Sequence, residues 1–224
     1  MDFLITLWVT FKLAFATTLI LLICGLPLAY WLAYSRFKLK PLVEALVSMP
    51  MVLPPSVIGY YMLVLYSPRS WFGAWLARCF DVRLAFTFEG VLIASVLFSL
   101  PFMVQPLHNG FRSLSDTLRE ASYTLGKSKT TTFFRVLLPN IKPSLITAIA
   151  LTFAHSIGEF GIVLMVGGNM PGKTRVASIA IYDEVQSLNF AAANQYAFIL
   201  FAVSFVLLTI IYTINKRNDT WKLL

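Results

Sequence analysis

Few side chains in this sequence could do chemistry, and two of them stand close together in an otherwise apolar stretch. His155 and Glu159 are four residues apart, a spacing that places two side chains on one face of a helix. Such a pair could begin a metal site, which needs further ligands, or an acid–base pair, which needs a group on a facing segment. The sequence supplies neither. We therefore predict no metal site, no cofactor and no catalytic residue, and we interpret Glu159 as a residue that shapes the protein around it.

The elements that carry these residues must be membrane-spanning helices. The chain has 224 residues, of which 58% are hydrophobic and only 12% are charged. It contains several uncharged runs of about 20 residues, the length with which a helix crosses a bilayer. Because a chain in lipid must satisfy its own backbone hydrogen bonds, the sequence predicts an all-α polytopic membrane protein. The net charge of +8 then reflects loop topology, and we predict no nucleic-acid partner.

Five spans are predicted within a single transmembrane domain, residues 1–224. They lie at approximately 10–34, 43–66, 90–108, 143–167 and 195–214. The short basic loop after the first span should face the cytoplasm, which places the N-terminus outside. With that topology 12 of the 18 Lys and Arg residues lie inside and 6 outside, the bias typical of membrane proteins. A sixth span would need residues 176–192, and Asp183 with Glu184 argues against it.

The second predicted span contains three prolines, Pro50, Pro54 and Pro55. Proline removes a backbone donor and disturbs a helix, and irregular backbone at membrane depth is tolerated only where protein or a water-filled cavity covers it. Two interpretations stay open: the prolines mark a transport pathway, or they kink a packing helix. The small and hydroxyl residues nearby and in the fourth span could line such a pathway or serve tight packing; they are Ser56, Gly59, Ser156 and Gly158.

A helix is also predicted in the first outer loop, at about residues 70–80. Trp71 and Trp75 lie on one face of it. An amphipathic helix of this kind lies in the membrane interface. We therefore expect it to contact membrane lipid at the outer leaflet.

The segment 112–142 is polar between apolar neighbours and carries six basic residues. Its first part, from Ser115, offers a helix start with acidic residues near the positive end of the helix dipole. Gly126 can end that helix in the left-handed conformation. A second helix is predicted from about Ser128 to Leu138, and Pro139 precedes the next span. The sequence therefore predicts a helix, a tight turn and a second helix in this segment. Such a structure could be a solvated connector or a docking element.

Glu120-Ala121-Ser122, Gly126, Val136 and Leu138-Pro139 resemble the EAA motif of ABC importer permeases. The family pattern is Glu-Ala-Ala, three residues, Gly, nine residues, Ile, one residue, Leu-Pro, and every spacing is kept. Ser122 and Val136 depart from it conservatively. The resemblance implies that residues 112–142 form coupling helices that dock into a groove on a cytoplasmic ATPase. It assigns coupling to Glu120 and Gly126, although Glu120 could instead simply stabilise the helix N-terminus.

Three further stretches resemble the molybdate, ModB-type branch of that family. They are residues 53–60, residues 156–161, and residues 168–175 with Ile181 and Tyr182. Tungstate and sulfate or thiosulfate permeases share parts of these signatures, so the ion stays open. The resemblance implies the MetI-like permease fold, with a pathway that we place at Pro54, Pro55, Ser56, Gly59, Ser156, Gly158, Glu159 and Gly161. Because a carboxylate repels an oxyanion, we expect Glu159 to pair with a basic group or to accept backbone hydrogen bonds that hold its turn.

The same resemblance implies the partners. A homodimer in the bacterial inner membrane would form one pathway, a periplasmic binding protein would deliver the oxyanion, and an ATPase dimer would hydrolyse ATP. The permease itself would not be an enzyme. A secondary transporter or channel is the alternative from another class; it would be expected to show inverted repeats, and we see no internal repeat in the sequence.

Overall fold

The computed structural model describes residues 2–219, which form helices joined by short segments, with no strand among them. Three of these helices are long and apolar enough to cross a membrane: α1 (Asp2–Tyr34), α5 (Phe88–Arg112) and α12 (Phe190–Asp219). Two bent helix pairs also qualify, which gives up to five spans if each pair counts as one. Of the predicted inner charges, Lys222 lies outside the described residues, as do the side chains of Lys216 and Arg217.

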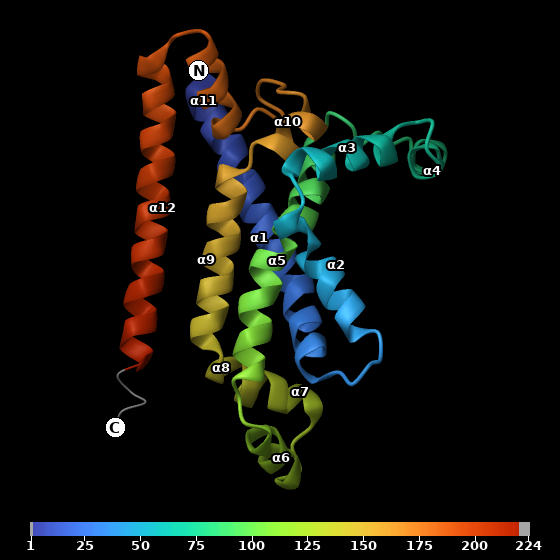
Figure 1. The fold of residues 1–224 in the computed structure, drawn as a ribbon, viewed down its shortest axis with the longest axis vertical. Helices are drawn as coiled ribbons and strands as arrows, with labels where there is room; N and C mark the ends of the chain where they lie inside the picture. The colour runs from blue at the N-terminus through green and yellow to red at the C-terminus, as the bar shows by residue number, and fades with distance from the viewer. Residues whose placement is uncertain (1, 220–224) are drawn as a thin grey trace.

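The first bent pair is the predicted second span. α2 (Lys40–Val52) and α3 (Pro55–Tyr66) meet at 110°, so α3 lies crosswise to the bundle (Figure 1). The expected disturbance by proline is confirmed. It falls at Leu53 and Pro54, because neither Pro54 nor Pro55 can donate the N–H that would continue α2.

The second bent pair leads out of the polar segment. Residues Lys129–Asn140 meet α9 (Lys142–Gly158) at 77°. The predicted fourth span is not continuous, because α9 ends at Gly158 and a short helix, α10 (Gly161–Gly167), follows after two residues.

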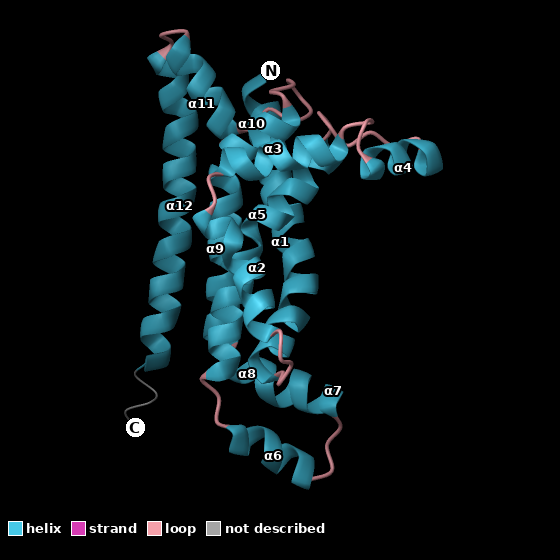
Figure 2. Ribbon diagram, turned by 45° about the vertical axis from the view of Figure 1, so that its right-hand side comes forward, coloured by secondary structure: helices cyan, strands magenta, loops and turns pink. Residues whose placement is uncertain are grey.

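The long helices run between two ends of the molecule (Figure 1). The N-terminal end of α1 lies at one end, which we call the outer end. α6 (Asp116–Thr124) and the last turn of α12 lie at the opposite, inner end (Figures 1 and 2). The chain passes between these ends in α1, α2, α5, α9 and α12, in the order predicted for five spans.

The loops at the outer end carry short helices of their own. α4 (Trp71–Phe80) projects sideways from the bundle (Figure 2), and Trp71 is exposed, as expected for an interfacial helix. α11 (Ala177–Gln186) has ten residues. That is too short to cross a bilayer, so the sixth span considered for residues 176–192 is not present.

The core lies where α1, α5 and α9 pack together. Residues of all three, such as Leu21, Leu107 and Ala148, are fully buried in one apolar cluster. α12 stands at the edge and packs on α9 and α11. Only 11% of its apolar window is buried, against 56% in α5, so most of α12 is free to face lipid or another chain.

Candidate translocation site and coupling loop

Two interruptions of helices lie against each other near the outer end. In the first, Leu53 and Pro54 adopt extended backbone between α2 and α3. In the second, Glu159 is extended, with φ −61° and ψ 127°, between α9 and α10. α3 packs on α10, and this contact brings the interruptions together. Segments that are about 100 residues apart in the chain thus form one site.

A hollow of about 610 Å3 lies between these interruptions. We call it the break hollow. Its lining residues are Pro55, Ser56, Phe98, Ala154, His155, Gly158, Glu159, Phe160 and Gly161. Five of the predicted pathway residues are therefore brought together here. The first turn of α3, with Ser56, faces this space, and the positive end of a helix dipole favours an anion.

The side chain of Glu159 is 3% exposed and is held by hydroxyl groups. Ser95 donates to one carboxyl oxygen at 2.5 Å and Ser99 donates to the other at 2.6 Å. The Ser99 hydroxyl also lies 3.1 Å from that of Ser156. We call these four residues the Glu159 cluster. It joins α5 to the end of α9, while the hydroxyl of Ser178 in α11 donates to the Glu159 carbonyl at 2.5 Å.

The expected partners of Glu159 were therefore wrong. No cation pairs with this carboxyl among the residues that the structure describes, and its acceptors are filled by side-chain hydroxyls rather than by backbone N–H groups. The oxygens of a buried carboxyl must accept hydrogen bonds. Serine hydroxyls on the neighbouring helix α5 donate these bonds, so no backbone N–H group is required. Ser95 and Ser99 were missed, although two hydroxyls one helical turn apart in an apolar span were a usable signal.

The other predicted pathway residues do not line the break hollow. Pro54 precedes α3 and is exposed. A Cβ on Gly59 would lie 2.8 Å from the Met165 Cβ, so this glycine allows α3 and α10 to pack closely. Ser156 is buried in the Glu159 cluster. For Gly59 and Ser156 the packing interpretation is the one that the geometry supports.

His155 lines the break hollow without forming a metal site. Its ring stacks on Phe102, with 3.9 Å between the ring centroids. Within residues 2–219 no three His, Cys, Asp or Glu side chains are grouped so that they could hold a metal ion.

At the inner end, residues 112–142 form the predicted helix, turn and helix, which we call the coupling loop. α6 begins after Ser115, whose hydroxyl accepts from the Thr117 N–H at 3.3 Å. At its other end the Lys127 N–H bonds to the Ser122 carbonyl and the Gly126 N–H to the Tyr123 carbonyl. This is a Schellman motif, which requires a left-handed residue, and Gly126 has φ +71°.

The second arm of the coupling loop differs in one detail from the prediction. α7 (Lys129–Thr132) and α8 (Leu138–Asn140) are joined by a π-helical segment, η1 (Phe133–Leu137). Pro139 explains this, because it has no N–H for the Arg135 carbonyl and its ring would collide with that carbonyl in a regular helix. The hydroxyls of Ser122 and Thr132, both buried, lie 2.8 Å apart and tie the two arms together.

Aromatic contacts fasten the coupling loop to the spans. Phe133 packs edge-on against Tyr30 of α1, with centroids 5.1 Å apart, and lies 6.0 Å from Phe111 of α5. The Arg119 guanidinium lies 4.4 Å from the centre of the Tyr34 ring, and the Tyr34 hydroxyl donates to the Phe111 carbonyl at 3.1 Å. These contacts connect the loop directly to the inner ends of α1 and α5.

The residues of the EAA-like pattern divide into two groups. Glu120, Ala121, Gly126 and Pro139 are exposed, whereas Ser122 is buried and Leu138 is partly buried. A Cβ on Gly126 would meet no atom within 4 Å. The need for glycine there is therefore conformational within this chain, and the space beside it is open to another molecule.

Comparison with known proteins identifies the family of the chain. Residues 25–219 match the family described as "Binding-protein-dependent transport system inner membrane component". The chain is 42% identical over 207 residues to the molybdenum transport system permease protein ModB of Azotobacter vinelandii, covering 92% of each protein. It is 34% identical over 209 residues to the sulfate transport system permease protein CysT of Escherichia coli K12, covering 93% of this chain and 75% of CysT.

The fold also matches a solved membrane transporter. A chain of the MetNI methionine ABC transporter, in an inward-facing conformation, superposes with a TM-score of 0.71. The alignment covers 95% of this chain and 94% of the other at 18% sequence identity. The similarity at this identity establishes the architecture, and the expected MetI-like permease fold is confirmed.

Proposed function

The chain belongs to the family of binding-protein-dependent transport system inner membrane components, as a permease subunit of an ABC importer, and we propose that its cargo is molybdate. The single observation that carries this choice is the 42% identity with ModB over 92% of both proteins. The sulfate permease CysT of Escherichia coli reaches 34% and is matched over 75% of its length. The permease has no enzymatic activity of its own.

Sulfate is the alternative cargo, because several CysT proteins align over 93–95% of this chain. The experiment that separates the two is competition of reconstituted uptake. Proteoliposomes should contain the permease, its ATPase and its binding protein, and should receive labelled molybdate with ATP inside. We expect unlabelled molybdate and tungstate to compete well, and sulfate to compete only at far higher concentration. Effective competition by sulfate at concentrations near those of molybdate would overturn the choice of cargo.

The proposed path of the ion runs past the break hollow. Two points support this. The backbone is irregular at both helix breaks, and irregular backbone at membrane depth needs a cover of protein or water. The positive end of α3, with Ser56, also faces the space. Although Glu159 lines the hollow, its carboxyl is hydrogen-bonded to Ser95 and Ser99, and these bonds join the end of α9 to α5. We propose Glu159 as a positioning residue and not as a ligand of the ion.

We further propose that two copies form the pathway in the inner membrane, with ATPase subunits at the inner end and a periplasmic binding protein at the outer end. The break hollow is only partly enclosed by this chain, and a second copy would close it. The exposed motif residues of the coupling loop are suited to a groove on an ATPase. ATP binding would move two such loops together, and the contacts of Phe133 and Arg119 would pass that movement to α1 and α5. Binding energy at the ATPase would thereby bias a two-state membrane domain.

The coupling proposal is tested by the complex itself. Permease and ATPase should co-purify, and uptake should require ATP. Accumulation driven by a proton gradient alone would favour the stand-alone secondary transporter.

A further inference from the structure

A second polar site lies in the inner half of the bundle, away from the break hollow. Gln105, His108, Asn109 and Arg112 follow one another on α5 at spacings of three, one and three residues, which puts all four on one face of the helix. A polar stripe of this length is unusual in a span. It continues for about two turns toward the coupling loop.

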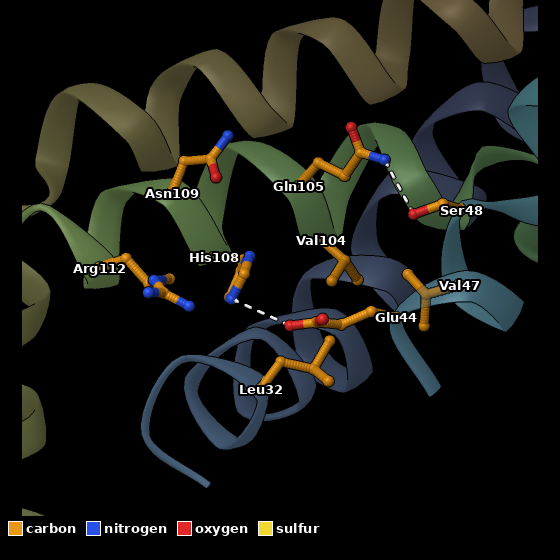
Figure 3. A pocket seen from close by; sticks show the side chains of 9 residues that line it. All are labelled: Leu32, Glu44, Val47, Ser48, Val104, Gln105, His108, Asn109 and Arg112. Carbon is orange, nitrogen blue, oxygen red and sulfur yellow. Dashed lines mark hydrogen bonds and ion pairs between the residues drawn. The ribbon is translucent and has the colours of Figure 1, made fainter. Parts of the chain in front are cut away.

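The stripe borders a hollow of about 320 Å3 between α1, α2 and α5 (Figure 3). We call it the inner hollow. Its lining residues are Leu32, Glu44, Val47, Ser48, Val104, Gln105, His108, Asn109 and Arg112. Figure 3 shows His108 of α5 directed toward Glu44 of α2, and Gln105 of α5 toward Ser48 of α2.

Only part of this polarity is satisfied within the chain. The Gln105 amide donates to the Ser48 hydroxyl at 3.1 Å. The Nε2 atom of His108 is buried without a hydrogen-bond partner in the described structure, and the nearest Glu44 oxygen is 3.7 Å away. Arg112 and Asn109 are exposed. Polar side chains within a span face protein or water rather than lipid, and we therefore expect water to enter the inner hollow.

The charges in the inner hollow favour an anion over a cation. Glu44 is the single carboxylate there, and it lies 3.6 Å from the Lys40 ammonium. The guanidinium of Arg112 has no carboxylate partner among the described residues. Guanidinium, amide and hydroxyl donors are the groups that bind tetrahedral oxyanions. The volume holds such an ion together with several waters.

We propose that the inner hollow is a second, weak binding site for the transported oxyanion, occupied as the ion leaves toward the cytoplasm. The donors would be the Arg112 guanidinium, the Asn109 and Gln105 amides and the Ser48 hydroxyl. Glu44 opposes an anion at close range, which keeps the site weak enough to empty. This inference rests on the proposed function as an oxyanion importer. The same chemistry would also accept the phosphate of an anionic lipid headgroup, so the experiment must separate the two sources.

The test uses the purified permease–ATPase complex in phosphatidylcholine nanodiscs, without the binding protein. Equilibrium dialysis with labelled molybdate measures binding to the wild type, to Arg112→Gln and to Asn109→Leu. The matched control is Arg36→Gln, which removes an exposed arginine from the basic loop at the same end of the molecule. Loss of a charge-assisted hydrogen bond should weaken the Arg112→Gln variant about tenfold or more. The control should stay within about twofold of wild type.

Three outcomes would overturn the proposal. Arg112→Gln and Asn109→Leu could both bind molybdate as well as wild type, or the wild type could bind none. Alternatively, nanodiscs with added phosphatidylglycerol could retain that lipid in an Arg112-dependent manner while molybdate shows no such dependence, which would identify a lipid site. ATP-driven molybdate uptake by the same wild-type preparation is measured in parallel. Failure of that uptake refutes the cargo, whereas intact uptake with binding that does not depend on Arg112 refutes the inner site alone.

Discussion

The Glu159 cluster and the coupling loop contain polar groups in opposite arrangements. In the cluster, three serines and one carboxyl turn toward one another and are almost fully buried. In the coupling loop, Glu120 and Gly126 face outward, and the bonds that shape the loop use backbone groups and the buried Ser122. The difference suggests that the cluster is built to hold this chain together and the loop to contact another chain.

The polar groups of the inner hollow are intermediate between these two cases, because only some of them are bonded within the chain. Some of its polar side chains face one another, as in the cluster. Among the described residues, however, the buried His108 Nε2 has no hydrogen-bond partner and lies 3.7 Å from a Glu44 oxygen, and Arg112 has no carboxylate partner. A buried polar group without a partner calls for an explanation, and a bound ion or water is one of them. Four predictions, ordered by the size of the expected effect, test the contrast between the cluster and the loop.

The largest effect on stability is expected from Glu159→Ala. It removes a buried side chain and leaves the hydroxyls of Ser95 and Ser99 without the carboxyl that accepts from them. The combined cavity and lost hydrogen bonds should cost about 2–5 kcal/mol. The apparent Tm in detergent would fall clearly. Glu89→Ala is the control, because Glu89 is a carboxylate outside the cluster at the start of α5, the helix that carries Ser95 and Ser99, and it should change Tm little. Equal shifts for both variants would mean that the cluster does not hold the helices.

The next effect is expected from Gly126→Asp in the coupling loop. The side chain strains a residue at φ +71° by about 1 kcal/mol and puts a negative charge into the surface that we assign to the ATPase. We expect about tenfold less ATPase to co-purify with this variant, with normal insertion into the membrane.

Gly172→Asp provides a matched control for that experiment. Gly172 has φ +73° and open space around its Cα, with the nearest side-chain atom 3.8 Å from a built Cβ. It lies in the loop before α11, at the outer end. Gly172→Asp introduces the same backbone strain as Gly126→Asp but at the outer end of the molecule, so the amount of bound ATPase should stay at the wild-type level. Equal loss in both variants would assign the effect to strain alone.

A smaller loss of stability is expected from removing single serines of the cluster, and the serine whose removal costs more tests the arrangement of the hydrogen bonds. Ser99 bonds to both Glu159 and Ser156, whereas Ser95 has a hydrogen bond to Glu159 alone. Ser99→Ala should therefore lower stability more than Ser95→Ala, with costs of about 1–3 kcal/mol for each buried group left unsatisfied. Thermal unfolding of the two variants side by side decides this. A larger loss in Ser95→Ala would contradict the arrangement of bonds.

The smallest effect is expected from Ser122→Ala. It removes the hydroxyl contact that links the arms of the coupling loop and restores the alanine of the family pattern. The loss should be about 0.5–1.5 kcal/mol of local stability. Faster hydrogen exchange in residues 116–124, with nearly unchanged uptake, would be the expected result. A large loss of uptake would show that Ser122 contacts the partner directly.

Composition and proline placement predicted most of the architecture. Apolar runs gave five passes in the right order because length and hydrophobicity suffice for that. Pro54 and Pro55 located the first helix break, and Gly126 located the turn of the coupling loop, since both residue types restrict backbone conformation directly. The π-helical segment before Pro139 was not predicted, although the same property of proline explains it.

The partners of Glu159 could not be predicted in the same way. Which side chains meet it depends on how α5 is rotated against α9, and this rotation is set by packing over the whole interface. Gly59 illustrates the same limit: a glycine near a proline break looks like pathway, and only the proximity of Met165 shows that it is there for close contact. The inner hollow was missed because Glu44 and Ser48 stand in a different span from the α5 stripe.

The division between cluster and loop is tested most directly by measuring molybdate uptake and ATP hydrolysis together in proteoliposomes with the binding protein. Glu159→Gln keeps the size of the side chain and should retain the ATPase. We predict that it keeps ATP hydrolysis and loses about tenfold in uptake, because the helix breaks are mispositioned. Gly126→Asp should lose both activities, because its ATPase is no longer engaged. Undiminished uptake in Gly126→Asp, or loss of hydrolysis in Glu159→Gln to the same extent, would contradict the roles assigned to the two regions.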